Sequence, residues 1–237
     1  MKLIYFPGFM GDARDLQALR LETWGFGPIE VRVETSVPHL RRRRSRREVL
    51  ADWANELRHE RANLVLAYSM GARIAAELLQ HVPELADRAL LLSPHPGLVT
   101  AAERQARYLQ DRAWAMRFRS ADSSRAWRRL ARAWNSQTVF QSQPQQPQQP
   151  QQSRFGREEQ RFRYARELEL LGLATQADQR SWYREARGIK VLIGERDAKF
   201  RELWRELPHE VVPEAGHRLL VDAPHSLRNF CVELLEG

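Results

Sequence analysis

A serine-centred turn is the strongest chemical signal in the chain. Residues 66–73 read Leu-Ala-Tyr-Ser-Met-Gly-Ala-Arg and lie between an apolar run and a segment with helical spacing. A sharp strand-to-helix turn exposes its serine for catalysis and needs small residues two before and two after it. Ala67, where glycine is usual, and Gly71 meet that need. Ser69 is therefore a candidate catalytic serine; the alternative is a turn whose serine caps the helix.

An acid and a histidine follow in the order that such a serine requires. Asp197 comes soon after the apolar run 189–193, and His217 comes soon after residues 210–212. Catalytic groups in the order serine, acid, histidine, each on a loop after a strand, form a triad in which histidine activates the serine. A lone aspartate would be a solvated loop residue and a lone histidine a surface or core residue. Three correct positions favour a triad of Ser69, Asp197 and His217.

Two backbone N–H groups are candidates for binding negative charge beside Ser69. Residues 7–11, Pro-Gly-Phe-Met-Gly, follow the first apolar run, and their glycines allow the backbone to approach a substrate. An oxyanion hole combines such a loop N–H with the N–H of the residue after the serine. We expect Phe9 and Met70 to supply them, although the same glycines could only form a turn.

The elements that position these residues alternate between strand and helix. Hydrophobic spacing predicts strands at 2–6, 28–33, 63–67, 89–92, 189–193 and 210–212, and helices at 47–58, 70–81, 200–206 and 224–235. Such alternation predicts an α/β fold with a mostly parallel sheet of about six strands and helices on both faces.

The middle of the chain departs from this alternation. Residues 97–181 are arginine-rich and helical in pattern, without a clear strand. We expect them to form a helical cap inserted between a core made of residues 1–96 and 182–237. Within the cap, residues 141–152 consist of Gln, Pro and one Ser, a composition that predicts a mobile loop. A partner-binding proline-rich segment is the alternative.

Composition excludes several classes of protein. The 237 residues are 43% hydrophobic, which excludes wholesale disorder, and no apolar run approaches the roughly 18 residues of a membrane span. Cys231 is the only cysteine, which excludes an internal disulfide framework and a cysteine-based zinc site. We expect a soluble cytoplasmic protein with no metal, no cofactor and no membrane contact.

The charge balance is basic and comes almost entirely from arginine. The chain has 38 Lys and Arg against 30 Asp and Glu, a net charge of +8. Arginine forks match carboxylates and phosphates, so a small anionic substrate is favoured. The arginine-rich run at 40–47 could neutralise nucleic-acid phosphates. A run of this kind is more often a solvated loop and helix start, and we expect no nucleic-acid partner.

Seven segments in one order resemble a single family. They are residues 8–11, 68–73, 95–98, 111–115, 134–140, 194–200 and 215–217. Together they resemble the MenH family of α/β-hydrolase-fold proteins, the 2-succinyl-6-hydroxy-2,4-cyclohexadiene-1-carboxylate synthases of menaquinone biosynthesis. The discriminating segments are 95–98, 134–140 and 194–200. The chain departs from the family pattern at Pro7 and Asn135, and residues 36–47 lack a usual Pro-Gly-His-Gly loop.

The resemblance implies a reaction and a set of substrate-binding residues. The reaction is elimination of pyruvate from a polycarboxylated cyclohexene, with the triad serine as base. By position, Arg73, Arg107, Tyr68 and Trp134 correspond to substrate-binding residues of the family, and Arg154 or Arg157 is a candidate for a further arginine. The first strand leads directly into the oxyanion loop, without the leading hairpin of many relatives, which implies the reduced sheet.

Two other interpretations remain open. Arg73 and Arg107 could merely form surface ion pairs, which contribute about 0–1 kcal/mol. The same fold could also carry a serine carboxylesterase or thioesterase, with Ser69 as a nucleophile rather than a base. An apolar acyl pocket would be expected for such an esterase, and arginines in the pocket would favour the lyase.

Overall fold

Six parallel strands form the centre of the computed structural model. They are β1 (Lys2–Phe6), β2 (Glu30–Val33), β3 (Leu64–Tyr68), β4 (Ala89–Leu92), β5 (Ile189–Gly194) and β6 (Glu210–Val212). Their order across the sheet is β2-β1-β3-β4-β5-β6, and each neighbouring pair is parallel. The predicted α/β fold with a reduced six-stranded sheet is confirmed.

The structure describes residues 1–36, 40, 45–140 and 156–237. The predicted mobile loop at 141–152, the arginines at 41–44 and Arg154 lie outside the described residues. Among the described residues, no helix is both long enough and apolar enough to cross a membrane.

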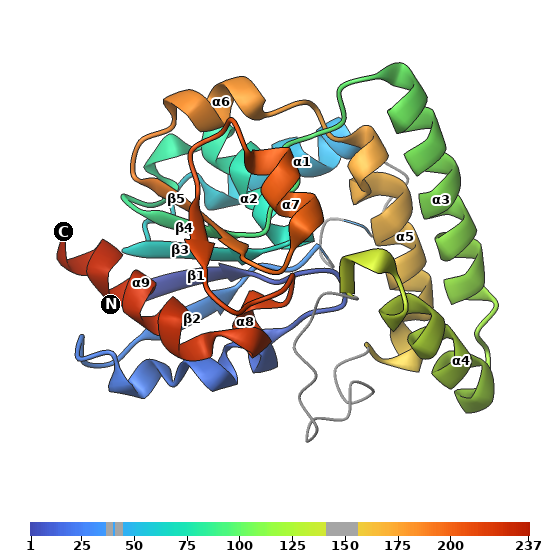
Figure 1. Ribbon diagram of the computed structural model, residues 1–237, viewed down its shortest axis with the longest axis horizontal. Coiled ribbons are helices and arrows are strands. Elements are labelled where there is room, and N and C mark those ends of the chain that lie inside the picture. The colour runs from blue at the N-terminus through green and yellow to red at the C-terminus, as the bar shows by residue number, and fades with distance from the viewer. Residues whose placement is uncertain (37–39, 41–44, 141–155) are drawn as a thin grey trace.

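Helices cover both faces of the sheet, as Figure 1 shows. Ile4 and Phe6 of β1 pack on one face with residues of α1 (Arg46–Leu57), α2 (Met70–His81), α6 (Arg180–Glu185) and α7 (Ala198–Trp204). The alternate residues Leu3 and Tyr5 pack on the other face with α8 (Leu219–Asp222), α9 (Pro224–Glu236) and a 3-10 helix, Ala13–Leu19. This alternation is expected for strands that are covered on both sides.

A third group of helices lies at one end of the sheet and follows β4 in the chain (Figure 1). This helical layer consists of α3 (Ala101–Arg119), α4 (Ser124–Asn135) and α5 (Arg161–Leu171), and it has an apolar core of its own that includes Phe118, Leu130 and Tyr164. In the described residues between β4 and β5 there is no strand. The division into a cap at 97–181 and a core stays a prediction.

Short 3-10 helices connect the longer elements. They span Leu21–Thr23, Pro83–Leu85, Thr138–Phe140, Glu158–Gln160 and Leu173–Thr175.

Several predicted boundaries are wrong by one or two residues. Helix α7 begins at Ala198 rather than at residue 200, because the Asp197 side chain caps it by accepting the Phe200 N–H. Helix α1 begins at Arg46, because Ser45 and Glu48 form a capping box there. The second strand begins at Glu30, two residues after Pro28.

The strand order reverses direction between β1 and β3. The chain passes from β1 to β2 at the edge of the sheet and then crosses β1 to reach β3. Ligands of open α/β sheets bind at such a reversal, outside the carboxyl ends of the strands. The loop after β1 and Ser69 after β3 both begin at that point.

Candidate active site

The turn from β3 to α2 holds Ser69 in an uncommon backbone conformation. Its φ and ψ are 50° and −110°, a positive φ that non-glycine residues rarely adopt and that often marks a functional site. The turn packs closely on the loop after β1, since a Cβ at Gly71 would lie 2.2 Å from the Pro7 carbonyl oxygen. The Ser69 side chain does not cap α2. The helix-cap alternative is therefore wrong.

The structure brings Ser69, His217 and Asp197 into one hydrogen-bonded series. Ser69 Oγ lies 3.2 Å from His217 Nε2, and His217 Nδ1 lies 2.7 Å from Asp197 Oδ2. Asp197 and His217 are almost fully buried. A carboxylate beside Nδ1 favours the tautomer protonated there, which leaves Nε2 free to accept the serine proton. The arrangement can therefore activate Ser69 as a base or as a nucleophile.

Neighbouring parallel strands explain this convergence. Asp197 follows β5 and His217 follows β6, and the two strands pair directly. A Cβ at Gly194 would lie 2.2 Å from the Gly216 carbonyl oxygen, so the absence of a side chain at Gly194 lets the loops approach.

Phe9 and Met70, the expected oxyanion donors, line the same cavity as Ser69. Met70 is the first residue of α2, where backbone N–H groups lack helical partners and the helix dipole favours negative charge. The Phe9 ring packs 4.8 Å from Trp134 and 5.5 Å from Phe118. These contacts join the loop after β1 to the helical layer. The oxyanion role of both residues stays a prediction.

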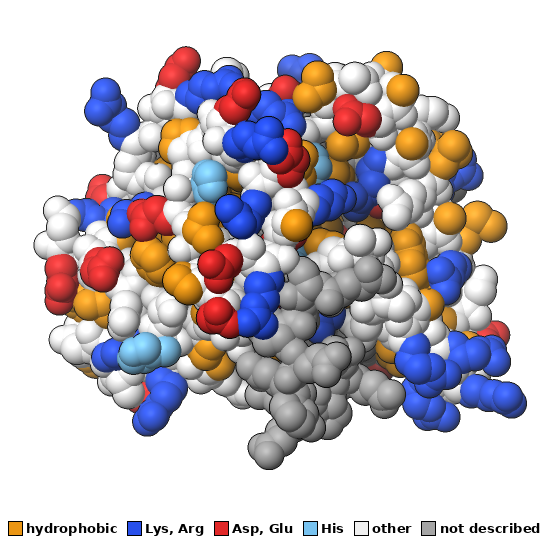
Figure 2. Space-filling model, in the orientation of Figure 1, with side chains coloured by type: hydrophobic (Ala, Val, Ile, Leu, Met, Phe, Trp, Pro, Cys, Tyr) orange, Lys and Arg blue, Asp and Glu red, His pale blue; other side chains and the backbone are white. Residues whose placement is uncertain are grey.

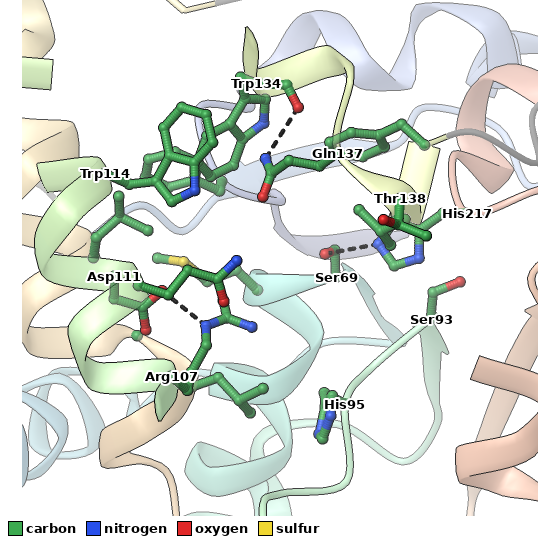
Figure 3. Close-up of a pocket in the computed structure, with 18 of the residues that line it drawn as sticks. Ser69, Ser93, His95, Arg107, Asp111, Trp114, Trp134, Gln137, Thr138 and His217 are labelled. Atoms are coloured by element: carbon green, nitrogen blue, oxygen red, sulfur yellow. Dashed lines mark hydrogen bonds and ion pairs between the residues drawn. The ribbon is translucent and has the colours of Figure 1, made fainter. Parts of the chain in front are cut away.

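The cavity next to Ser69 lies between the sheet and the helical layer and has a volume of about 350 Å³. Figure 3 shows Ser69, Ser93 and His217 on one side, with Arg107 and Asp111 on α3 facing them. Its aromatic lining consists of Phe9, Trp114, Trp134, Phe140 and Phe200, and its polar lining includes Ser93, His95, Gln110, Gln137 and Thr138. The volume suits a small-molecule ligand.

Among the described residues, three cationic side chains line this cavity: Arg73, Arg107 and Lys199. Arg73 is buried, and its Nη1 donates to the neutral Gln176 Oε1 at 2.7 Å. Burial, together with the positive Arg46 and Arg107, lowers the pKa of Arg73 to about 9. Its guanidinium makes no ion pair with any described residue, so a surface ion pair does not account for Arg73.

Arg107 has a different environment. Its Nε donates to Asp111 Oδ1 at 2.8 Å, one helical turn along α3, and its side chain is 31% exposed. This ion pair holds the guanidinium at the cavity wall. The predicted ion-pair alternative is thus partly correct for Arg107, which is paired but lies within the cavity.

The remaining predicted substrate-binding residues lie in different places. Trp134 lines the cavity, whereas Tyr68 lines a second, smaller one of about 100 Å³ together with Asn135 and Arg218. Strand alternation explains this, because Tyr68 packs on the sheet face opposite to Ala67. Arg157 is exposed, and its backbone N–H donates to the Tyr164 hydroxyl.

The polar residues of the cavity that were not predicted as site residues include Ser93, His95, Gln137 and Lys199. His95 is buried, and burial followed by the positive Arg73 and Lys199 lowers its pKa well below the usual value. Its Nδ1 accepts the Gly97 N–H at 3.1 Å. Of these four, His95, Gln137 and Lys199 belong to the discriminating segments 95–98, 134–140 and 194–200, which could have identified them.

Positive charge also covers the outer surface of the helical layer. Figure 2 shows a group of blue side chains over α4, whose exposed arginines are Arg125, Arg128, Arg129 and Arg132. Such charge raises the local concentration of anions. Throughout the described ranges, no three His, Cys, Asp or Glu side chains come together as metal ligands do.

Comparison with known proteins identifies the family. The family model for alpha/beta hydrolases matches residues 6–229. The chain belongs to the alpha/beta hydrolase family. A structure titled as MenH from S. aureus superimposes with a TM-score of 0.80 at 19% identity, and the match covers 100% of this chain and 93% of that one. At that identity the match supports the fold alone.

Sequence relatives narrow the resemblance to one group within the family. The 2-succinyl-6-hydroxy-2,4-cyclohexadiene-1-carboxylate synthase of Escherichia fergusonii is 35% identical over 162 residues, which cover 65% of this chain and 60% of that enzyme. The enzyme of the same name from Klebsiella pneumoniae is 34% identical over 176 residues, covering 72% of this chain and 67% of that enzyme. These relatives confirm the family resemblance that the sequence segments predicted.

Proposed function

We propose that this chain is a carbon–oxygen lyase of menaquinone biosynthesis. It eliminates pyruvate from a polycarboxylated cyclohexene and forms 2-succinyl-6-hydroxy-2,4-cyclohexadiene-1-carboxylate. Two relatives that are 34–35% identical carry the name of that synthase. The alignment with the first of them spans 60% of that enzyme's length, so the activity needs a direct test.

The cations in the cavity carry this proposal. The named product has two carboxylates, one on the ring and one on the succinyl arm, and pyruvate has a third. Since the substrate is the sum of the two, it carries three carboxylates. Arg73, Arg107 and Lys199 supply three positive charges around the same cavity, of which Arg107 is already paired with Asp111. Buried arginine without an acid partner is unfavourable, and a bound carboxylate would remove that cost.

The reaction would use the triad as a proton relay. Ser69 Oγ removes a ring proton made acidic by the neighbouring succinyl ketone and passes its own proton to His217 Nε2. The electron pair of the C–H bond becomes part of the new double-bond system as the ring C–O bond to the pyruvyl group breaks. The pyruvyl group leaves as an enolate and takes up the proton held by His217, which gives pyruvate and returns the imidazole to its neutral form. Asp197 stabilises the imidazolium of His217. The N–H groups of Phe9 and Met70 bind the negative charge that develops on the ketone oxygen.

No cofactor is needed for these steps, because they are proton transfers and a redox-neutral elimination. A serine carboxylesterase or thioesterase would use the same triad with Ser69 as nucleophile. The three cations favour the lyase, since a neutral acyl group gains nothing from them.

The decisive assay follows pyruvate release by purified protein incubated with the synthase's substrate. A panel of simple esters and thioesters is tested in parallel, and Ser69→Ala is the control for contaminating enzymes. Turnover of the polycarboxylate, lost in Ser69→Ala, supports the lyase. Ester turnover without pyruvate release would instead identify an esterase and overturn the proposal.

A further inference from the structure

Ser93 is an unusual residue in the wall of the cavity. It directly follows β4, has a φ of 47° and is fully buried. Its Oγ has no hydrogen-bond partner among the described residues, yet it lines the cavity. A buried hydroxyl without a partner is unfavourable, and left-handed backbone at a serine adds strain. Both features are expected where a side chain is held ready for a ligand.

Lys199 is a cation in the same cavity. It lies in the first turn of α7 and forms no ion pair with any of the described residues. Partial desolvation, followed by the positive Arg107, lowers its pKa. The cavity therefore holds a second positive charge near Arg107, and no described carboxylate forms an ion pair with it, although Asp197 attracts it from two residues away.

Ser93 and Lys199 belong to segments that pack together. Ser93 follows β4 and Lys199 follows β5, which pair directly in the sheet. Trp204 Nε1 of α7 donates to the Pro94 carbonyl at 2.7 Å, and the Phe200 ring lies 5.9 Å from the His95 ring. These contacts hold the segment 93–95 against α7.

This pair of segments lies on the triad side of the cavity. The Phe200 ring is 4.6 Å from the His217 ring. In Figure 3, Ser93 lies on the side of Ser69 and His217, whereas Arg107 and Asp111 face them from α3. Ser93 therefore lies across the cavity from Arg107, and Lys199 follows β5, the strand that also precedes Asp197 of the triad.

We infer that Lys199 and Ser93 form a second carboxylate-binding subsite, on the wall of the cavity that carries the triad. The Lys199 ammonium supplies charge and the Ser93 hydroxyl supplies one directed hydrogen bond, so together they hold the two oxygens of a carboxylate. Arg73 and Arg107 hold the other carboxylates. This inference rests on the proposed function for its substrate, whose acidic groups lie on separate arms. Binding on two walls would stretch the substrate across Ser69.

Kinetics with the polycarboxylate substrate test the subsite. Lys199→Met should raise KM about 10- to 150-fold, the range for a charge-assisted hydrogen bond, with kcat within about threefold. Ser93→Ala should raise KM by about three- to tenfold. Lys199→Arg should restore most of the affinity, because it keeps the charge. Lys190→Met is the matched control, since Lys190 pairs with Glu210 at the sheet and lies outside the cavity lining.

A direct binding measurement separates this inference from the proposed function. Calorimetry with pyruvate, succinate and their uncharged amides needs no turnover. Weaker binding of either carboxylate to Lys199→Met, but not to Lys190→Met, supports the subsite even if wild type releases no pyruvate. The more strongly affected acid tells whether the leaving group or the succinyl arm occupies it. Equal carboxylate binding by all variants, or a KM within twofold in both Lys199→Met and Ser93→Ala, overturns the inference.

Discussion

The triad and the buried arginine of the cavity, Arg73, differ in how far other residues of the protein supply their bonding partners. Ser69, His217 and Asp197 bond to one another across 3.2 and 2.7 Å, and each is positioned by the end of a strand. Arg73 is buried beside a single neutral acceptor, Gln176. The triad residues are thus hydrogen-bonded to one another without a ligand. The Arg73 guanidinium, in contrast, has no ion-pair partner among the described residues.

This difference suggests that the triad would perform the reaction, whereas Arg73 and Arg107 would select the substrate. Triads of this geometry occur on many proteins of the fold, so the triad alone does not specify the reaction. Arg107 lies on α3 in the helical layer, outside the strands and loops that carry the triad, and its Nε donates to Asp111. Arg73 comes from α2 but reaches Gln176, a residue between α5 and α6. Under the proposed function, selectivity for the substrate would therefore depend on residues at the junction between the helical layer and the sheet.

Ser69→Ala should have the largest effect, because it removes the proton-accepting atom of an otherwise complete relay. We expect kcat to fall by about a thousandfold or more. The melting temperature should change little, because the Ser69 side chain caps no helix and borders the cavity. Turnover and a thermal melt measured on the same sample check both points. A variant that kept most of the wild-type rate would remove Ser69 from the mechanism.

Arg73→Ala and Arg107→Ala test whether the two arginines select the substrate. Each should lower kcat/KM for the polycarboxylate by about 10- to 150-fold, since each removes a charge-assisted contact. Lysine at either position should rescue only in part, because a point charge cannot reproduce the planar fork. Turnover of a neutral ester, if wild type has any, should hardly change. Kinetics on both substrate classes make the measurement.

The outcome that contradicts this prediction is equally specific. If both substitutions leave the polycarboxylate within about twofold of wild type, the effect is that of an ordinary surface change. The arginines would then not bind substrate. Good ester turnover that is unaffected by either substitution would point to the esterase.

The sheet and the triad could be predicted from the sequence because strand ends determine them. In a parallel sheet, residues that follow neighbouring strands meet at one edge, so the runs before Ser69, Asp197 and His217 were enough. Tyr68 shows what a motif alone misses. It adjoins Ser69 in sequence, but the twofold period of the strand directs it to the other face, with Leu64 and Leu66.

The cavity lining was less predictable because it depends on how the helical layer packs against the sheet. Lys199 and Gln137 belong to recognisable segments, yet nothing in their spacing says that they share a cavity with Arg107. Ser93 carries no motif at all; its signal is a positive φ and an unpartnered hydroxyl, which only coordinates provide. Long-range packing, rather than local pattern, determines those positions.

The smallest expected effect concerns stability, and it should have opposite signs at the two arginines. Replacing a buried ion by an apolar side chain of similar size is neutral or stabilising by about 1–4 kcal/mol, whereas orphaning Gln176 Oε1 costs about 1–3 kcal/mol. For Arg73→Met we expect a net gain near 1 kcal/mol, or about 2–4 °C in Tm for a chain of this size. Because burial lowers the folded-state pKa of Arg73 to about 9, below its unfolded value, the cost of its charge is fully present at every pH below about 9. The Tm gain should therefore be the same at pH 6 and pH 8.

Arg107→Met should instead lower Tm, since it leaves the buried Asp111 carboxylate without its cation. Differential scanning calorimetry of wild type and the two variants at both pH values makes the comparison. Arg73→Met should bind the polycarboxylate poorly and yet have a higher Tm than wild type. A gain in stability with a loss of function is expected at a site whose buried charge is compensated only by a bound ligand. Equal losses of Tm in the two variants would show that Arg73 is a structural residue whose charge the folded protein already accommodates.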